Sequence, residues 1–421
     1  MAKISKLKSN LLFQNISSQG LLQLANYAIP ILIIPFVTRA LGPDGFGEAS
    51  YAQNIAMYLT LLVNFGFEHS ATQEVAIHKN DYLQLQRIFS VVVSFKFCLF
   101  LLSLLILGGL WYIMPQIQDN FALYFVAALF NLGWVFFPTW FFQGMERMAK
   151  MCVFSFAVKL IGALLIVFFV RDEGDSLFYL GALTAANLLV GVVAFCYILR
   201  EYKLSFVPTV HFKNADVVRK GMPIFLNSFL VNCNLVVGVT IMGFYLTNGE
   251  IGVYSGAQKI IMAVMMITSQ PITLAVFPRI SRMFVQSKEE GFRYLKKSLL
   301  WVGMFSFMVS LAVALLGPLL AVPFLGEKFA ASAPLLLLLS PLPFTTTIAS
   351  TLTVQGLYGL QLQRFAPLVG IVVFGSNYFF NWLMIPSLGM NGAVYTWILC
   401  QVVEILLVGS LLYGHKPKNE I

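Results

Sequence analysis

Charged residues are scarce in this chain. Lysine, arginine, aspartate and glutamate together make up 11% of its 421 residues, whereas 59% are apolar. Soluble globular proteins keep about a quarter of their residues charged, so this composition, with a mean hydropathy of +0.82, excludes a soluble fold. We therefore expect lipid to be the solvent of most of the chain.

Histidine and cysteine are also rare, and neither is clustered. The four histidines map to predicted loops or the tail, and the five cysteines fall inside apolar segments without the spacing of metal ligands. The sequence contains no Walker-type phosphate loop. We therefore expect no metal site, no cofactor, no redox chemistry and no nucleotide hydrolysis, and we predict that the cysteines are small buried hydrophobic residues.

Long apolar runs are what the chain has in abundance. Twelve of them are long enough to cross a hydrocarbon core of about 30 Å. They cover approximately residues 11–38, 48–67, 88–110, 121–142, 151–170, 177–199, 222–246, 252–277, 298–322, 335–356, 365–385 and 391–412. The sequence thus predicts an all-α integral membrane protein with twelve transmembrane helices.

The distribution of basic residues predicts the orientation of these helices. If the N-terminus is cytoplasmic, the inner loops hold 21 of the 27 lysines and arginines, and the outer loops keep only Arg39, Arg171 and Lys328. By the positive-inside rule, both termini are then expected in the cytoplasm. The formal net charge of +9 is accordingly an orientation signal, and no nucleic-acid partner is expected.

A short repeat predicts two related halves. Residues 47–55 (GEASYAQNI) and 252–260 (GVYSGAQKI) share the pattern G-x-x-S-x-A-Q-x-I, and each copy opens an apolar run. The longest polar and basic linker lies at 200–221, so we expect an N-terminal six-helix bundle at 1–199 and a C-terminal one at 222–421. Because six is an even number, both halves insert with the same orientation and form a parallel repeat.

Amide and hydroxyl side chains form stripes within the predicted spans. Those at helical spacing are Asn15, Gln19, Gln23 and Asn26; Gln53, Thr60 and Asn64; Asn227 and Asn234; Thr347 and Thr351; and Asn377 and Asn381. Such groups either hold helices together by hydrogen bonds or face water. Their recurrence in both halves favours a wet central cleft, for which the candidate residues are Gln19, Gln23, Asn26, Gln53, Asn64, Asn234 and Gln258.

Few ionisable residues lie inside the predicted spans. Lys96 and Lys159 lie within reach of the cytoplasmic headgroups, so each either snorkels or lines a substrate path. Lys259 stands where the first repeat copy has an amide, and with Arg39 these lysines are candidates for holding an anionic group. For Glu404 three alternatives are open: its carboxylate pairs with a cation, its carboxyl group is neutral, or it binds a proton or sodium ion during transport.

Several motifs resemble those of a known family. They are Asn26-Tyr27-x-x-Pro30, Pro35-Phe36-x-x-Arg39-x-Leu41-Gly42, Ile251-Gly252-Val253-Tyr254-Ser255-x-x-Gln258-Lys259 and Phe277-Pro278-Arg279-Ile280-Ser281. They are similar to motifs of Wzx-type O-antigen or polysaccharide flippases, which belong to the MOP superfamily together with the MurJ flippase and the MATE drug exporters. The resemblance implies two six-helix bundles around a central V-shaped cavity.

The resemblance also implies a function. Flippases of this type move undecaprenyl-pyrophosphate-linked repeat units from the cytoplasmic to the periplasmic leaflet of the bacterial inner membrane, in O-antigen and lipopolysaccharide biosynthesis. The implied partners are this lipid-linked oligosaccharide and membrane lipid, with an O-antigen polymerase and a chain-length regulator as further candidates. The chain is then expected to be a transporter working by alternating access and not an enzyme.

Two rival functions are less compatible with the sequence. A MATE-like cation or drug antiporter normally needs buried carboxylates, and the first span contains no Asp or Glu. Relatives often carry an acidic residue in span seven, where this chain has Asn232-Cys233-Asn234, and this weakens the expectation of ion coupling through that span. A membrane polysaccharide polymerase or glycosyltransferase would need a large outer loop or an acidic pair at the outer face, and the predicted outer loops are short.

Overall fold

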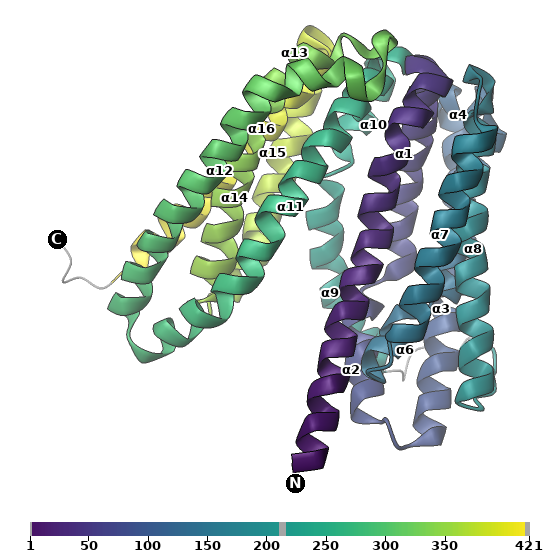
Figure 1. The fold of residues 1–421 in the computed structure, drawn as a ribbon, viewed down its shortest axis with the longest axis vertical. Helices are drawn as coiled ribbons and strands as arrows, with labels where there is room; N and C mark the ends of the chain where they lie inside the picture. Colours follow the sequence, from purple (N-terminus) through teal and green to yellow (C-terminus); the bar gives the residue numbers. More distant parts are fainter. Residues whose placement is uncertain (1, 210–215, 417–421) are drawn as a thin grey trace. The chain divides into compact units, whose positions relative to one another are not determined.

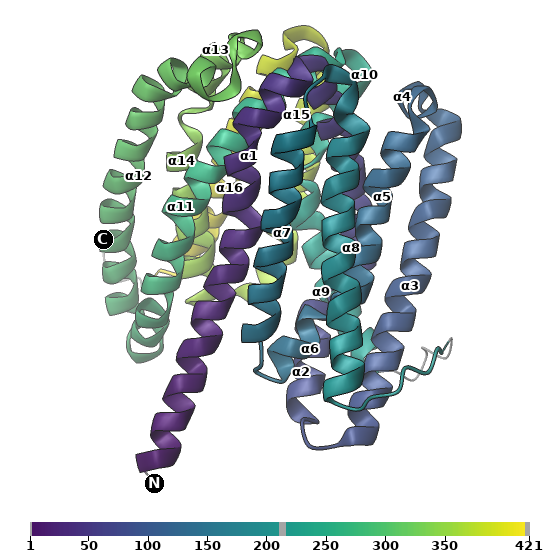
Figure 2. The same cartoon turned by 45° about the vertical axis from the view of Figure 1, so that its right-hand side comes forward.

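Helices make up the structure throughout its described part (Figures 1 and 2). This computed structural model describes the backbone of residues 2–209 and 216–416, and the side chains in these ranges apart from 2–28, 150, 227, 267 and 269–275. No strand occurs in these two ranges. The all-α prediction is therefore confirmed.

Residues 2–209 and 216–233, as far as the structure describes them, form nine α-helices and one 3-10 turn. They are α1 Ala2–Asn64, α2 Phe67–Ile77, α3 Tyr82–Ile113, α4 Pro115–Asp119, α5 Phe121–Phe136, α6 Thr139–Gly144, α7 Ala149–Phe169, the turn Glu173–Asp175, α8 Ser176–Glu201 and α9 Asp216–Cys233. In both views α7 lies beside α8, which in turn packs on α5.

From residue 234 to residue 416, where the description ends, the chain adds seven α-helices and one π-helix. They are α10 Val237–Tyr245, α11 Asn248–Gln286, α12 Lys288–Leu325, α13 Ser332–Leu339, α14 Leu342–Ser350, the π-helix Thr351–Tyr358, α15 Ala366–Leu388 and α16 Met390–Gly414. Short 3-10 turns at Glu327–Phe329 and Gln363–Phe365 precede α13 and α15.

The helices are long and apolar enough for a multi-pass membrane protein. Within the described residues nine segments qualify as spans, or ten when α9 and α10 are taken as one broken span. The expected count of twelve is not reached, partly because α1 takes in two predicted runs, 11–38 and 48–67, across a kink at Gly42. The predicted run 252–277 corresponds to part of α11, in which the side chains of residues 267 and 269–275 are not described.

Large apolar side chains cover the outer face of α12. Leu300, Trp301, Phe307, Met308 and Leu319 are each between 58% and 70% exposed. In water a continuous apolar surface of this kind would promote association, whereas acyl chains solvate it without cost. The exposed face of α12 is therefore a lipid-facing surface.

Glycine and capping residues set the kinks and ends of several helices. Gly42 has φ 62° and ψ −178°, which glycine adopts readily because it lacks a Cβ atom. At the start of α11, Thr247 and Glu250 form a capping box, in which each side chain accepts the backbone N–H of the other residue. The stretch labelled α1 is thus two helical segments that meet at a kink at Gly42.

The helices pack into two compact units. The first unit comprises Met1–Leu41 and Glu48–Asn232, and the second comprises Gly42–Gly47 and Cys233–Ile421. By packing, the chain passes from the first unit to the second at the break between α9 and α10, and α9 itself belongs to the first unit. The halves 1–199 and 222–421, joined by a linker at 200–221, stay a prediction.

Aromatic rings fill the core of the first unit. The ring of Phe89 on α3 lies 5.8 Å from that of Phe141 on α6 and 5.4 Å from that of Phe195 on α8, measured between centroids. In the second unit a smaller core around Leu357 and Val408 joins the π-helix to α16. Each unit thus has apolar contacts of its own.

The first glycines of the two repeat copies, Gly47 and Gly252, meet within the second unit. A Cβ atom added to Gly47 would overlap the carbonyl oxygen of Asn248, and one added to Gly252 would overlap that of Pro43. Gly47 and Gly252 hold the same position in the two copies. Equivalent glycines therefore let the segment Gly42–Gly47 and the start of α11 touch backbone to backbone, which explains why this piece of α1 packs with the second unit.

We expect Gly47→Ala and Gly252→Ala each to lower the free energy of unfolding by about 1–3 kcal/mol, because the added methyl group must push two backbones apart. Thermal unfolding of the purified protein in detergent measures this loss. Gly109→Ala on α3 is the matched control, since a Cβ atom there meets nothing within 4 Å. Equal unfolding midpoints for all three variants would contradict the close contact.

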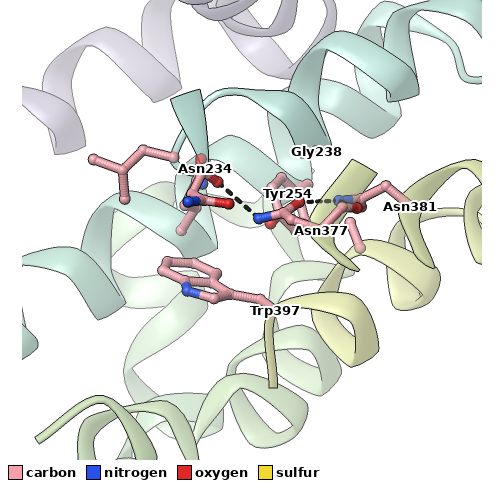
Figure 3. A pocket seen from close by; sticks show the side chains of 9 residues that line it. Asn234, Gly238, Tyr254, Asn377, Asn381 and Trp397 are labelled. Carbon is pink, nitrogen blue, oxygen red and sulfur yellow. Dashed lines mark hydrogen bonds between the residues drawn. The ribbon is translucent and has the colours of Figure 1, made fainter. Parts of the chain in front are cut away.

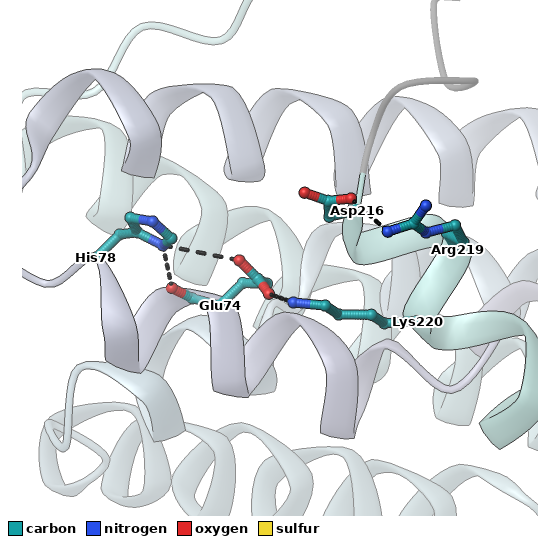
Figure 4. A network of polar contacts seen from close by, with 5 residues as sticks. All are labelled: Glu74, His78, Asp216, Arg219 and Lys220. Carbon is teal, nitrogen blue, oxygen red and sulfur yellow. Dashed lines mark hydrogen bonds and ion pairs between the residues drawn. The ribbon is translucent and has the colours of Figure 1, made fainter.

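An ion pair and a ring stack hold α9 on the first unit (Figure 4). Lys220 Nζ lies 2.6 Å from Glu74 Oε1 on α2, and His78 Nδ1 lies 3.7 Å from the other carboxylate oxygen. Glu74 is 8% exposed, whereas Lys220 is at the surface. Nearby, the rings of Phe65 and Phe225 stack with centroids 5.0 Å apart. These contacts explain why α9 packs with the first unit.

The two ends of this ion pair should respond differently to mutation. Lys220→Met takes away the closest cation of a buried carboxylate, so we expect a clear drop in the thermal unfolding midpoint. Glu74→Gln leaves an ammonium group that water can solvate, so its drop should be smaller. Arg219→Gln is the control, because Arg219 and Asp216 form an exposed pair that should contribute little. A larger drop for Glu74→Gln than for Lys220→Met would contradict this account.

Candidate functional site

A cavity of about 320 Å³ lies inside the first unit. Its volume is within the range of small-molecule sites in proteins. Helices α1, α5, α7 and α8 form its walls, through residues that include Ile33, Phe130, Trp134, Lys159 and Asn187. The wall is mostly apolar, with one cation and one amide side chain among its lining residues.

Lys159 is the cation of this cavity. It is the eleventh of the 21 residues of α7, so about 15 Å of helix separate it from either end at 1.5 Å per residue. A lysine in mid-span is poorly placed to snorkel to the headgroups, and an ammonium group at that depth is costly unless it meets a partner or water. The structure therefore favours the cavity over the headgroups as the surroundings of Lys159.

Lys96 has a different environment from the one expected. Its side chain on α3 is 3% exposed, and Nζ donates a hydrogen bond of 2.8 Å to the carbonyl oxygen of Trp134. Lys96 is not among the residues that line the cavity. The expected contact of Lys96 with an anionic group stays a prediction, and the geometry of this state does not favour it.

Hydrogen bonds from α8 hold the cavity wall on α5. Asn187 Nδ2 donates to the carbonyl oxygen of Phe130 at 2.9 Å, and Thr184 Oγ1 donates to that of Val126 at 3.0 Å. Gly133 permits this close approach, because a Cβ atom there would collide with Asn187. These two side chains bind helices together, which was the alternative to a water-facing role for polar groups in spans.

The other expected residues of the first unit lie outside the cavity lining. Gln53 is half-buried and makes a hydrogen bond with Tyr179 of α8. Asn64 is half-buried at the end of α1, and Arg39 is exposed. The structure does not bring these three to the cavity. The side chains of Gln19, Gln23 and Asn26 lie outside the described residues.

Three asparagines meet at the start of α10 in the second unit (Figure 3). Asn377 Nδ2 donates to the carbonyl oxygen of Asn234 at 3.1 Å, and Asn381 Nδ2 donates to that of Asn377 at 2.9 Å. A broken helix leaves carbonyl groups without helical partners, and Asn377 supplies a donor to one of them. Gln258 and Trp397 line the adjoining depression, which has about 20 Å³ for water-sized molecules, enough for roughly one water.

The structure brings together two of the expected residues, Asn234 and Gln258, at this depression. Lys259, the next residue along α11, turns elsewhere, with Nζ 4.5 Å from the centroid of the Phe46 ring. This is the geometry of a cation–π contact. Lys159 and Lys259 belong to different units, so each cation is described within its own unit.

Glu404 on α16 accepts a hydrogen bond of 2.8 Å from Thr353 Oγ1 of the π-helix. Its side chain is half-buried. Among the described residues no lysine, arginine or histidine forms an ion pair with Glu404. Of the three alternatives for this residue, pairing with a cation is thus disfavoured, and a neutral carboxyl group and a proton or sodium site both stay open.

Sequence reasoning missed several residues of both sites. Phe130, Trp134 and Asn187 line the cavity, and Trp397 lines the depression. The amide of Asn187 inside a span was a usable signal, since polar groups in spans mark contacts or cavities. The aromatic residues carried no signal, because aromatic residues are common throughout this apolar chain.

Solved structures with the same fold are membrane transporters. An inward-facing MATE-family multidrug resistance transporter of the MOP superfamily aligns with a TM-score of 0.69 at 15% identity, over 94% of this chain and 95% of the other. The lipid II flippase MurJ, in an inward closed conformation, aligns with a TM-score of 0.68 at 14% identity, over 93% and 87%. The chain therefore has the fold of the MATE and MurJ transporters.

The family follows from sequence matches. Residues 12–284 match the model of the family described as "Polysaccharide biosynthesis protein". A candidate O-antigen transporter of Escherichia coli (strain K12) is 27% identical over 83% of each chain, and one of Shigella dysenteriae is 26% identical over 78% of this chain and 82% of its own. This chain belongs to the polysaccharide biosynthesis protein family, and its expected resemblance to the MOP superfamily is confirmed.

Proposed function

We propose that this protein is a flippase for lipid-linked polysaccharide repeat units, which it moves from the cytoplasmic to the periplasmic leaflet of the bacterial inner membrane. The cavity around Lys159 carries this proposal, because it combines a cation with apolar walls at mid-span in a member of a polysaccharide biosynthesis family. The names of the O-antigen transporter relatives and of MurJ support cargo of the same class.

The chemistry of the cargo suits such a cavity. An undecaprenyl-pyrophosphate-linked oligosaccharide has an apolar tail, an anionic pyrophosphate and sugars rich in hydroxyl groups. The tail stays in lipid, the Lys159 ammonium group attracts the pyrophosphate, and the side-chain oxygen of Asn187 in the same cavity wall accepts hydrogen bonds from hydroxyl groups. Alternating access then opens the site first to one side and then to the other.

Membrane voltage can drive this step without a nucleotide. Moving one charge across the bilayer is worth about 2.3 kcal/mol per 100 mV, so a dianionic headgroup gains on the order of 4–5 kcal/mol by leaving an inside-negative cell. We further propose that both termini lie in the cytoplasm. An O-antigen polymerase and a chain-length regulator are the proposed partners, on the periplasmic side of the membrane.

A MATE-like antiporter of cationic drugs is the nearest alternative, since a MATE transporter shares the fold. The cavity lining disfavours it, because its ionisable residue is a lysine and its lining residues include no carboxylate. A cationic drug would meet a like charge in an apolar environment, where repulsion is strong. A polymerase or glycosyltransferase would need an acidic catalytic pair, and nothing in either site supplies one.

Removing the charge of Lys159 tests the proposed function. We expect Lys159→Met and Lys159→Gln each to slow flipping of an undecaprenyl-pyrophosphate-linked oligosaccharide by about ten- to a hundredfold, because a charge-assisted contact with pyrophosphate is lost. Translocation in proteoliposomes, with an imposed potential, measures the rate. Lys328→Gln is the control, because it removes one positive charge from an exposed turn. Undiminished flipping by both Lys159 variants would remove the basis of the proposal.

Ion coupling at Glu404 is a separate part of the proposal. If Glu404 exchanges a proton or binds sodium during transport, Glu404→Gln should make flipping insensitive to an imposed proton or sodium gradient while preserving the rate without one. The amide oxygen of Gln can still accept the Thr353 hydrogen bond, so the fold should survive. An undiminished response of the variant to both gradients would show that Glu404 is structural.

A further inference from the structure

The junction between α5 and α6 leaves one backbone carbonyl without its usual donor. In a continuing α-helix the carbonyl of Trp134 would accept the N–H of residue 138, but Pro138 has no N–H and disfavours a helical conformation at the residue before it. The neighbouring N–H groups are engaged, that of Phe137 with Gly133 and that of Thr139 with Phe137, each at 2.9 Å. The helix itself therefore offers the Trp134 carbonyl no donor.

The side chain that fills this gap comes from another helix. Lys96 of α3 donates to the Trp134 carbonyl oxygen at 2.8 Å. In a membrane-embedded unit a backbone carbonyl without a donor is costly, and no other hydrogen bond from a described side chain to this oxygen is seen. Glu68 of α2 adds an attractive charge interaction with Lys96. A buried ammonium group is thus supported on one side by a carbonyl and on the other by an acid.

This arrangement bears on the cavity, because Trp134 belongs to its wall. Lys96 itself does not line the cavity, whereas Trp134 lines it together with Lys159. The α5 backbone is held at Phe130 by Asn187 and at Trp134 by Lys96. Between them these two donors fix the stretch of α5 that carries both aromatic wall residues.

We propose that Lys96 is a positioning residue, which replaces the N–H group missing at Pro138 and thereby holds Trp134 in the wall of the substrate cavity. This inference rests on the proposed function, and it assigns different roles to Lys96 and Lys159 of the first unit. Lys159 contributes charge to the site and must be cationic, whereas Lys96 contributes a hydrogen-bond donor to the backbone.

Paired substitutions at both lysines separate these roles. Met keeps the length of the side chain but removes charge and donor, whereas Gln restores a donor without charge. If Lys96 is a backbone donor, Lys96→Gln should bind a lipid-linked oligosaccharide within a few-fold of wild type, and Lys96→Met should bind it on the order of tenfold more weakly. At position 159 both substitutions should be equally harmful. Binding to the protein in nanodiscs provides the measurement.

Thermal unfolding gives a second readout that does not depend on the cargo. Lys96→Met should lower the unfolding midpoint, because it leaves the Trp134 carbonyl bare, and Lys96→Gln should recover most of the loss. A wild-type midpoint for Lys96→Met combined with lost binding would overturn the proposal and assign Lys96 to the anion.

A background variant shows whether Lys96 acts through Trp134. In a Trp134→Ala protein the wall residue is gone, so adding Lys96→Met should weaken binding no further, although it still lowers the unfolding midpoint. Additive losses of affinity would show that Lys96 touches the cargo directly and would also overturn the proposal. If the wild-type protein binds no lipid-linked oligosaccharide, the proposed function fails. The unfolding midpoints then still show whether Lys96 is a hydrogen-bond donor to the backbone or a contact for an anion.

Discussion

In a bilayer, each backbone carbonyl and N–H group needs a partner within the protein, and the places where helices break show how this chain meets that requirement. Pro138 interrupts the helix after α5, and Lys96 reaches across from α3 to the carbonyl of Trp134. At the start of α10 the same task falls to Asn377, which donates to the carbonyl of Asn234. At these two helix breaks, polar side chains thus supply the hydrogen bonds that the backbone carbonyl groups lack.

Lys159 lies midway along α7 and lines a cavity with mostly apolar walls. The proposed transport depends on this position, because it brings the charge of Lys159 to the cavity. Membership of a polysaccharide biosynthesis family supports the anionic, lipid-linked cargo proposed above. An apolar wall beside a single cation also disfavours cationic cargo, because a like charge in a low-dielectric site is strongly repelled.

Periodicity and composition predicted the fold class, whereas they only partly predicted the site. The repeat at residues 47–55 and 252–260 located a real contact, since Gly47 and Gly252 lie against backbone of the opposite copy. Asn234 and Gln258 were expected, among other residues, in a central cleft; they line a small depression of the second unit, and their part in a cleft stays a prediction. The anion contact expected of Lys96 is not favoured. Sequence reasoning missed this, because nothing in the span of Lys96 shows that Pro138, 42 residues further along the chain, leaves a backbone carbonyl beside Lys96 without its helical donor.

The sequence by itself determined that most of this chain is embedded in lipid, that it crosses the membrane many times and that it carries a repeat. Hydropathy and residue spacing are properties of single segments, so these conclusions need no knowledge of which segments are neighbours. Only the tertiary structure decided which polar groups are used up by backbone carbonyls and which line a cavity. That distinction depends on contacts between helices far apart in sequence, such as α3 with α5 and α10 with α15. Lys96 and Lys159, which both lie in apolar segments of the sequence, therefore have different proposed roles.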